Sequence, residues 1–502
     1  MKKILLYFAL ISIVLSGCDK DNKDIEGNED KDKDKVEVED EVVTLSSIAV
    51  TEQPIKKEYY VGEVFILQGM RVTAYYSDKT TRIITVIADM LSYDFSTAGE
   101  KTVTITYEGK TTAPSGIIVI APFVGSGTSA LPFEISTPEQ LVILSELTNA
   151  NIDMYLRAHY KLTADINLSN YGLNWNYDRG WIPIIFKGNF EGNNHTISGL
   201  YINGNIFGAG LFGEVSEGTV QNLGVEGDIT TSSGYIGGVV GRVINGNITN
   251  CYFVGSLSGE SVVGGVVGSV IGSSNIISCY SKGTVSGSSS QVGGVVGNQT
   301  NFSTLGGSII SKCYSTCTVR GGNSVGGVVG ETNGRSEENF CSISNCYATG
   351  AVSGNNYVGG IAGQVSVYSN ITYCYATGTV SGNNYVGGIA GDVRVHGSVT
   401  NCIALNSSLT RLPGSDWSFG FGRVAGYDDS NNLSGNFAWY NMVVTDGVRW
   451  NLDEDKNGWN FDYSSDFYFI NEYFTPENGW MTEYGKLPGF GAAIDLPEHL
   501  SW

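Results

Sequence analysis

The sequence has few prolines, few histidines and a shortage of positive charge. Its 502 residues include 10 prolines, 4 histidines, and 29 lysines and arginines against 50 aspartates and glutamates, so the net charge is −21 at pH 7. Nucleic acid and anionic membrane surfaces repel such a chain, and we expect neither as a partner. The histidines are scattered, and no HExxH, G-x-S-x-G or triad-like grouping occurs. The sequence therefore offers no recognisable hydrolase motif.

Long hydrophobic runs are also missing, except at the N-terminus. There Lys2 and Lys3 precede an apolar run from Ile4 to Leu15, which is too short to span a bilayer and fits the h-region of a signal peptide. The run closes with Leu15-Ser16-Gly17-Cys18. This segment resembles the lipobox of bacterial lipoproteins. The resemblance implies cleavage before Cys18, acylation of that residue, and a membrane as partner through the lipid anchor.

The segment after Cys18 contains almost nothing apolar. From Asp19 to Glu41 it carries aspartate, glutamate, lysine and asparagine, which cannot bury enough surface to offset the entropy of ordering. We expect a solvated, disordered tether. Asp19 resembles an inner-membrane retention signal of some bacteria, whereas the acidic run resembles a surface-export signal of others. Both destinations stay open, and we expect the cell envelope, at the outer membrane or cell surface.

The next stretch, residues 45–121, alternates apolar and polar residues in short runs. Two such runs are Arg71 to Tyr76 and Thr102 to Tyr107, and turn signals follow both. This pattern predicts a small antiparallel sandwich. Together with Leu45 to Val50 and the close at Tyr107-Glu108-Gly109-Lys110, the runs resemble a group 3 bacterial immunoglobulin-like (Ig-like) domain. Such domains usually space or display a neighbouring module.

A helix signal opens the following unit. Thr137 is a predicted N-cap, Pro138 suits the first helical turn, and Gln140 completes a capping box. The apolar residues that follow at helical spacing are Leu141, Leu144 and Leu147. We expect this amphipathic helix to cover the first rung of a solenoid, because an uncovered end exposes strand edges and an open core.

Internal repeats are the strongest feature of the chain. The segment Asn345 to Gly350 recurs 28 residues later at Tyr373 to Gly378, and Val358 to Gly363 recurs at Val386 to Gly391. Looser copies continue the series at steps of 27 to 33 residues. Each glycine in a helix interior costs roughly 1 kcal/mol, so these glycine-rich, β-branched repeats predict stacked β-coils.

These repeats resemble the GLUG motif of bacterial surface proteins, from about Ile197 to Gly426. The resemblance implies a β-solenoid and says little about activity, since most proteins with the motif are surface or adhesion-type proteins. About eight coils with rungs roughly 4.8 Å apart predict a rod on the order of 40 Å long. The expected fold class is all-β: an Ig-like β-sandwich, then a parallel β-helix with a short N-terminal capping helix.

The cysteines follow the repeat. Six of them occupy one repeat position, which predicts an internal stack of small, reduced hydrophobic side chains. They are Cys251, Cys279, Cys313, Cys346, Cys374 and Cys402. Cys317 and Cys341 fall off this register and are the one pair that could form a disulfide bridge.

When the repeats are aligned, the residues that follow the glycine motifs form one column of polar side chains. Its last three members, Glu331, Gln364 and Asp392, form a possible ligand-facing column on the outer surface. Glu331 and Asp392 would stand two rungs, about 10 Å, apart, near the upper limit for an inverting pair of carboxylates in a glycoside hydrolase. The alternative is a solvated row containing an ion pair between Arg242 and Glu214. No aromatic platform beside the column is visible in the sequence.

Residues 438–502 are rich in aromatic residues and form either a C-terminal cap or a small binding module. Exposed aromatic faces there would stack on sugar rings. Within this stretch Asp453, Asp455 and Asn457 precede Gly458 at the spacing of a calcium loop, although Ser464 replaces the usual bidentate glutamate. Calcium is therefore the one cofactor that the sequence suggests, and an ordinary polar turn is the alternative.

The sequence thus predicts a cell-envelope lipoprotein that serves as an adhesion or ligand-binding scaffold. Glycans or surface proteins are the expected ligands, and a β-helix enzyme that degrades polysaccharides, as hydrolase or lyase, is the alternative. The expected segments are a signal peptide at 1–18, a tether at 19–44, the Ig-like domain at 45–121, the capped solenoid at 122–437 and the aromatic end at 438–502.

Overall fold

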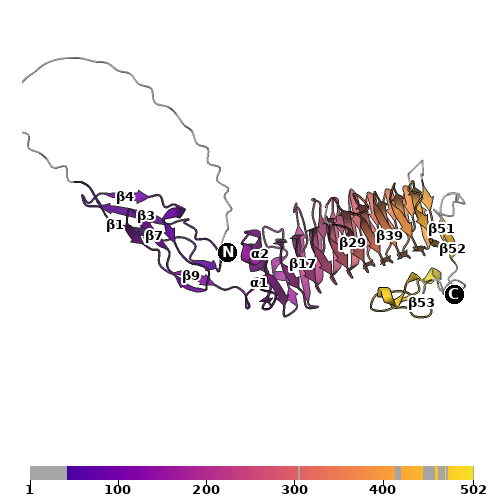
Figure 1. The fold of residues 1–502 in the computed structure, drawn as a ribbon, viewed down its shortest axis with the longest axis horizontal. Coiled ribbons are helices and arrows are strands. Elements are labelled where there is room, and N and C mark those ends of the chain that lie inside the picture. Colours follow the sequence, from indigo (N-terminus) through magenta and orange to yellow (C-terminus); the bar gives the residue numbers. More distant parts are fainter. Residues whose placement is uncertain are drawn as a thin grey trace, which may run out of the picture.

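An Ig-like β-sandwich is followed by a long rod of parallel strands, with α-helices at the joint (Figure 1). This arrangement confirms the predicted all-β class. The computed structural model describes residues 42–303, 306–412, 420–444, 458–461, 470 and 473–500. Within these ranges no helix has the length and hydrophobicity needed to cross a membrane.

The Ig-like domain is built from short, mostly antiparallel strands. Its strands are β1 (Leu45–Glu52), β2 (Glu58–Tyr60), β3 (Arg71–Tyr76), β4 (Thr81–Ile84), β5 (Leu91–Ser92), β6 (Gly99–Lys101), β7 (Thr104–Tyr107), β8 (Lys110–Thr112) and β9 (Ile117–Ile120). They form the sheets β1-β3-β4, β2-β9-β6 and β5-β7-β8. Alternation along each strand buries every second side chain, as in β3, where Val72 and Ala74 are fully buried. The core consists of two small clusters, one around Tyr59 and one around Val72.

The predicted helix caps the rod. Helix α1 (Pro138–Asn149) begins after Thr137, whose Oγ1 accepts a hydrogen bond from Gln140 N at 3.3 Å. The capping box is shifted by one residue, because Gln140 Oε1 accepts from Ser136 N at 2.8 Å and not from Thr137 N. Helix α2 (Asp153–Leu156) follows directly. The three predicted leucines of α1 are buried against the first coils.

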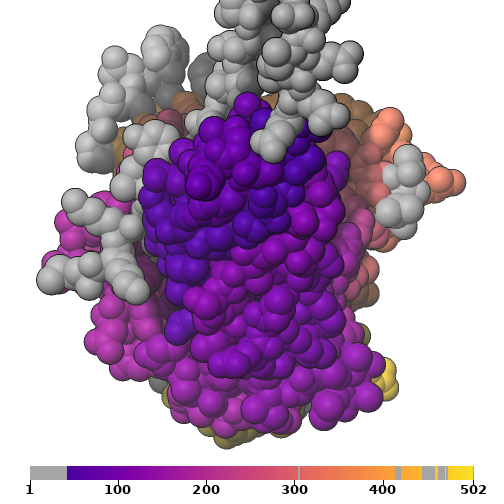
Figure 2. Space-filling view, turned by 90° about the vertical axis from the view of Figure 1, so that its left-hand side faces the viewer, coloured from indigo at the N-terminus to yellow at the C-terminus, as the bar shows by residue number. Residues whose placement is uncertain are grey.

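The Ig-like domain rests on this cap. Tyr60 packs against the solenoid core cluster, and Gly62 lies so close to Met154 that a Cβ at position 62 would touch the methionine sulfur. Figure 2 looks at this end of the molecule, where the Ig-like domain and the cap lie in front of the solenoid. The contact joins the β2–β3 connection to the loop before α2 and to α2 itself.

The rod consists of four parallel sheets, which have eleven, sixteen, nine and seven strands within the described residues. The eleven-stranded sheet runs from β10 (Phe133–Ile135) to β49 (Leu433–Ser434), and its strands, about 4.8 Å apart, give a length of roughly 50 Å. One coil visits the sheets in the order seven, nine, eleven and sixteen. An example is β37 (Asn356–Gly359), β38 (Ala362–Val365), β39 (Ser369–Thr372), β40 (Tyr375–Ala376) and β41 (Val380–Gly382).

The glycine pairs mark a corner where successive coils touch backbone to backbone. A Cβ on Gly360 would meet the carbonyl oxygen of Gly388 in the next coil, and a Cβ on Gly327 would meet the carbonyl oxygen of Gly360. No side chain fits there. The repeated glycines are therefore required by close approach of the coils, which explains why the motif recurs in every coil.

The cysteine column lies inside the rod, as the repeat predicts. All six of its members have no exposed surface. Neighbours contact one another along the axis, since Cys279 N donates to Cys313 Sγ and Cys346 N donates to Cys374 Sγ, each at 3.4 Å. Asn436 occupies the next position of the column, and its Oδ1 accepts a hydrogen bond from Cys402 N at 3.0 Å. Cys317 and Cys341 are also buried free thiols.

A tyrosine column runs along the sixteen-stranded sheet beside the cysteines. Its rings stack at 4.7 to 5.2 Å with interplanar angles of 3° to 11°. The members are Tyr252, Tyr280, Tyr314, Tyr347 and Tyr375. The C-terminal tail (residues 473–500) lies against the last two of them, where Trp480 is fully buried and donates from Nε1 to Asn345 Oδ1 at 3.0 Å. This part of the aromatic stretch therefore packs along the side of the rod.

Candidate functional site

The polar column predicted from the sequence exists in register on the nine-stranded sheet. Adjacent parallel strands pair each member with the next one. The members are Glu214, Arg242, Ser269, Asn298, Glu331, Gln364 and Asp392, and Tyr427 follows Asp392. They come from β16 (Phe212–Ser216), β20 (Val240–Ile244), β24 (Val267–Ile271), β28 (Val296–Thr300), β33 (Val329–Asn333), β38, β43 (Ala390–Val393) and β48 (Ala425–Asp428).

The expectation that this column points into open solvent is wrong at two of its positions. Asp392 is 1% exposed and Ser269 is 2% exposed. A second row of side chains, the flanking column, packs against the polar column from the seven-stranded sheet. Its members, all with left-handed backbone at φ from 50° to 63°, are Tyr235, Val262, Gln291, Ser324, Tyr357 and Tyr385.

Direct contacts show how the two columns interlock. Gln291 Nε2 donates to Glu331 Oε2 at 2.7 Å, and the Ser324 hydroxyl lies 3.3 Å from the amide of Gln364. These two flanking side chains thus reach polar residues of the following coil. Left-handed backbone is unfavourable for residues other than glycine, and for a β-branched residue such as Val262 it is an outlier. The stacked coils therefore hold these side chains in place.

Asp392 is the centre of the C-terminal end of the column. Its Oδ2 forms an ion pair with Arg394 Nε at 2.8 Å, while its Oδ1 is buried and has no hydrogen-bond partner. Burial raises the pKa of the Asp392 carboxyl, and the bond from Arg394 opposes that rise. Leaving a buried carboxylate oxygen without a hydrogen-bond partner is costly.

Gln364 joins this ion pair. In one orientation of its amide, Nε2 lies 3.4 Å from Asp392 Oδ2. In the reversed orientation its oxygen accepts from Arg394 Nε at 2.7 Å and from Nη2 at 3.2 Å. We adopt the reversed orientation because it pairs an acceptor with charged donors at better distances. Asp392, Gln364 and Arg394 then form one compact polar group.

Tyrosine rings line this polar group. Tyr357 and Tyr385 stack at 5.2 Å with an angle of 9°, and the Arg394 guanidinium lies 5.7 Å from the centre of the Tyr357 ring. Tyr427, which is 40% exposed, meets Tyr385 edge to face at 5.5 Å. One coil earlier the flanking position is Ser324, which is too short to stack on Tyr357. The aromatic platform missed in the sequence is the tyrosine before each Val-Gly-Gly in the two closest repeats.

The N-terminal end of the polar column has a similar composition. The predicted ion pair is confirmed, with Arg242 Nη2 at 2.7 Å from Glu214 Oε2. The Arg242 guanidinium lies 5.8 Å from the centre of the Tyr235 ring, and Phe207, 66% exposed, meets Tyr235 edge to face at 4.9 Å. Arg242 Nε is buried without a hydrogen-bond partner. Each end therefore combines an ion pair, an aromatic group and one unsatisfied polar atom.

A separate polar surface covers the first coils. A cavity of about 380 Å³ lies over β11 (His159–Leu162), β14 (Asn189–Glu191) and β17 (Thr219–Gln221), whose outward side chains alternate with buried Tyr160, Phe190 and Val220. Glu191 there accepts hydrogen bonds from Gln221 Nε2 at 2.7 Å and from Asn222 Nδ2.

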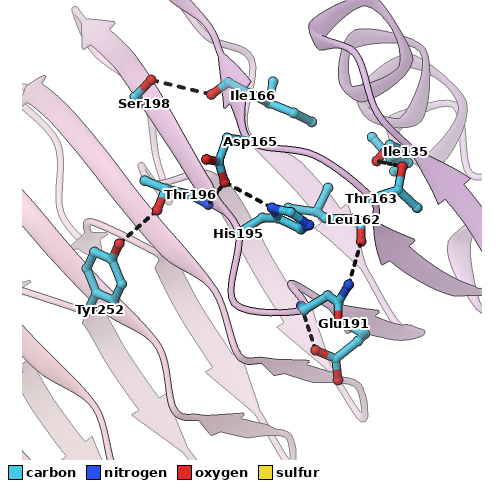
Figure 3. A network of polar contacts seen from close by, with 11 residues as sticks. Ile135, Leu162, Thr163, Asp165, Ile166, Glu191, His195, Thr196, Ser198 and Tyr252 are labelled. Carbon is cyan, nitrogen blue, oxygen red and sulfur yellow. Dashed lines mark hydrogen bonds and ion pairs between the residues drawn. The ribbon is translucent and has the colours of Figure 1, made fainter.

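The neighbouring loops of these first coils hold a further polar network. In Figure 3, His195 Nδ1 and Thr196 N both contact Asp165 Oδ1, and the hydroxyls of Thr196 and Tyr252 meet at 2.8 Å. These polar groups largely bond to one another. The network fixes the loops.

Two predicted sites lie outside the described residues. They are the lipidation residue Cys18 and the calcium candidate Asp453, Asp455 and Asn457. In the part of the chain that the structure describes, no group of three or more histidine, cysteine, aspartate or glutamate residues is arranged to hold a metal ion.

Family models and curated relatives match parts of the chain. The model of the group 3 bacterial Ig-like domain matches residues 52–115, and the GLUG motif matches 232–258, 321–353 and 354–381. Halomucin of Haloquadratum walsbyi is 31% identical over 28% of this chain, which spans 2% of that protein. A protein of Evansella cellulosilytica, provisionally named a Gly-rich membrane protein, is 36% identical over 22% of the chain, which spans 13% of it.

Solved structures resemble the chain weakly. A Bacteroides ovatus protein, provisionally named an immunoglobulin A1 protease, superposes with a TM-score of 0.38 and 22% identity, covering 73% of this chain and 94% of its own. An IgA1 protease superposes with a TM-score of 0.36 and 14% identity, covering 76% of this chain and 27% of its own. These scores are too low to transfer an activity. The matched motifs decide the assignment: the chain contains a group 3 bacterial Ig-like domain followed by GLUG motif repeats.

Proposed function

We propose that this protein is a cell-surface β-helix scaffold that binds glycans at the C-terminal end of its polar column. The observation that carries the proposal is the contact between the Asp392, Gln364 and Arg394 group and the stacked rings of Tyr357 and Tyr385. Sugars present hydroxyls on their edges and C–H groups on their faces. They are therefore bound by neighbouring polar and aromatic side chains of this kind.

The comparisons support the location. One of the two curated relatives is named a membrane protein and the other halomucin, and both are similar to part of this chain. A solenoid that carries its binding surface along one side, on a stalk made by an Ig-like domain, suits display away from a membrane. Lipid anchoring through Cys18 is part of this proposal. Cys18→Ser should shift the full chain from the detergent phase to the aqueous phase, and unchanged partitioning would contradict the anchor.

Binding without cleavage is the expected activity. Glu331 accepts a hydrogen bond from Gln291, and Asp392 is ion-paired with Arg394, so protein groups already engage both carboxylates of the enzymatic alternative. A general acid instead needs a carboxyl group that is free to protonate the leaving oxygen. We expect the protein to retain glycans and to release no oligosaccharides from polysaccharides.

A glycan array with the full chain in detergent tests the proposal. Tyr357→Ala should weaken binding about ten-fold, because an aromatic contact contributes roughly 0.5–1.5 kcal/mol beyond its buried area. The matched control is Tyr368→Ala, which removes a tyrosine of the same coil that stacks on His396. Equal losses in both variants, or no binding by the native protein, would overturn the proposal. Release of oligosaccharides would favour the enzyme.

A further inference from the structure

The two ends of the polar column share features that the coils between them lack. Among the described residues, the buried side-chain atoms without a hydrogen-bond partner are Arg242 Nε, Asn383 Oδ1, Asp392 Oδ1, Asn406 Oδ1 and Arg411 Nε. The two that belong to the polar column lie in its two ion pairs, one at each end. Aromatic rings from the flanking column and its neighbours accompany both pairs.

The spacing between these ends follows from the register. Five rung steps lead from Arg242 through Ser269, Asn298, Glu331 and Gln364 to Asp392. Steps of about 4.8 Å place the two ion pairs roughly 24 Å apart along the rod axis. The intervening side chains are all polar and form a continuous strip in register, in which Ser269 Oγ donates to Asn298 Oδ1 at 3.0 Å.

The charges of the strip favour a neutral ligand. Each ion pair balances one arginine with one carboxylate, Asp428 and Asp429 add negative charge at the C-terminal end, and Glu331 leaves the middle negative. A polyanionic polymer would meet this carboxylate and the net charge of −21 of the whole chain. Hydroxyl-rich, uncharged chains can instead accept from the partly exposed arginines of the two ion pairs and stack on rings at both ends.

We propose that the polar column binds one extended, neutral, β-1,4-linked polysaccharide chain that runs parallel to the rod axis and contacts both ends at once. The proposal rests on the proposed function and specifies its ligand class. Such a chain advances by about one rung per sugar ring, so roughly five or six rings bridge the two ends. Engaging the second end is then an intramolecular step, which raises affinity without any new kind of contact.

A length series of cello-oligosaccharides, from two to about eight glucose units, tests the proposal by calorimetry on the full chain in detergent. We expect weak binding up to about four units and a rise of about ten-fold or more once the ligand spans the strip. The double variant Phe207→Ala with Tyr235→Ala should abolish this rise while leaving the affinity for short ligands unchanged. Tyr357→Ala should weaken the affinity at every length.

The controls separate this inference from the proposed function. His159→Ala, in the cavity on the first coils, should leave the whole series unchanged, and thermal unfolding should show that each variant is folded. Affinity that is independent of length, or a rise that survives the double variant, overturns axial binding and leaves the glycan-binding function standing. No binding at any length also overturns the inference, and the glycan array with the same sample then decides whether the proposed function fails with it.

Discussion

The Ig-like domain and the solenoid bury their side chains in different ways. In the Ig-like domain the core is divided into two small clusters beneath short strands. In the solenoid a single cluster continues from Phe123 into the C-terminal tail at Leu500. Each coil contacts chiefly its neighbours, so the stability of the rod is approximately a sum of coil and interface contributions. One chain thus combines a small sandwich that has its own two core clusters with a stack of coils that share a single core.

The two regions also use glycine differently. Gly109 in the Ig-like domain has φ +78°, and a Cβ there would meet nothing within 4 Å, so this glycine serves a turn. Gly360 in the solenoid has no positive φ and is required because the next coil approaches its α-carbon. The same residue type therefore relieves backbone strain in one region and permits close stacking in the other.

The largest expected effect comes from breaking the stack at a glycine corner. Gly360→Ala should destabilise the solenoid by more than about 3 kcal/mol, because backbone from the neighbouring coil occupies the space that the methyl group needs. Gly109→Ala should cost only about 1 kcal/mol through its positive φ. Denaturant unfolding of both variants measures the difference. Similar losses would mean that the coils can separate at little cost.

The second largest expected difference between the two regions is in thiol reactivity. All eight described cysteines lie in the solenoid and are buried, and burial raises the pKa of the Cys341 thiol to about 12. Buried thiols are out of reach of the reagent, so the native solenoid should resist alkylation at pH 8. Under partial denaturation, the extent of labelling should increase as the rod unfolds and should not change when the Ig-like domain unfolds.

Mass spectrometry after alkylation counts the labelled thiols in each state. Eight labelled sites in the unfolded chain, in addition to any contribution from Cys18, are expected without a reducing agent. A missing pair that appears only after reduction would identify a disulfide, with Cys317 and Cys341 as its first candidates. Rapid labelling of the native protein would contradict the continuous core.

The smallest effects are opposite responses to pH. In the Ig-like domain, hydrogen bonds from the hydroxyl and the backbone N–H of Thr80 lower the pKa of Asp78. They stabilise the charged form, so their contribution is present above the ordinary aspartate pKa of about 4 and disappears as the pH falls through the lowered value. Asp78→Asn should therefore destabilise the domain slightly at neutral pH, and the difference should vanish in acid.

Asp392 in the solenoid should behave in the opposite way. Burial raises its pKa, so the folded state binds a proton more tightly than the unfolded state and loses stability as the pH rises from about 4 through the raised value. Asp392→Asn should remove this loss and flatten the stability profile of the solenoid in that window. Thermal unfolding between pH 3 and 8 compares both variants with the native chain, and parallel profiles for Asp392→Asn and native protein would contradict the buried carboxylate.

Sequence periodicity determined the architecture, because in a stack of coils the number of residues between two positions fixes where they lie relative to each other. Residues 28 apart, such as Cys346 and Cys374, have to occupy equivalent places once the chain forms a β-coil. The cysteine column, the register of Glu331, Gln364 and Asp392, and the pairing of Arg242 with Glu214 could therefore all be predicted. The capping helix was predicted for a local reason, since Thr137 and Pro138 fix a helix start without help from distant residues.

Tertiary structure alone decided what covers the polar column and where the C-terminal tail lies. Gln291 and Tyr357 of the flanking column contact residues of the following coil, an offset that no repeat alignment contains. The burial of Asp392 likewise follows from packing between the two columns. Trp480 contacts Asn345 across more than a hundred residues because the tail returns along the rod. Periodicity specifies which residues are equivalent, whereas packing between different faces of the coil determines which of them meet.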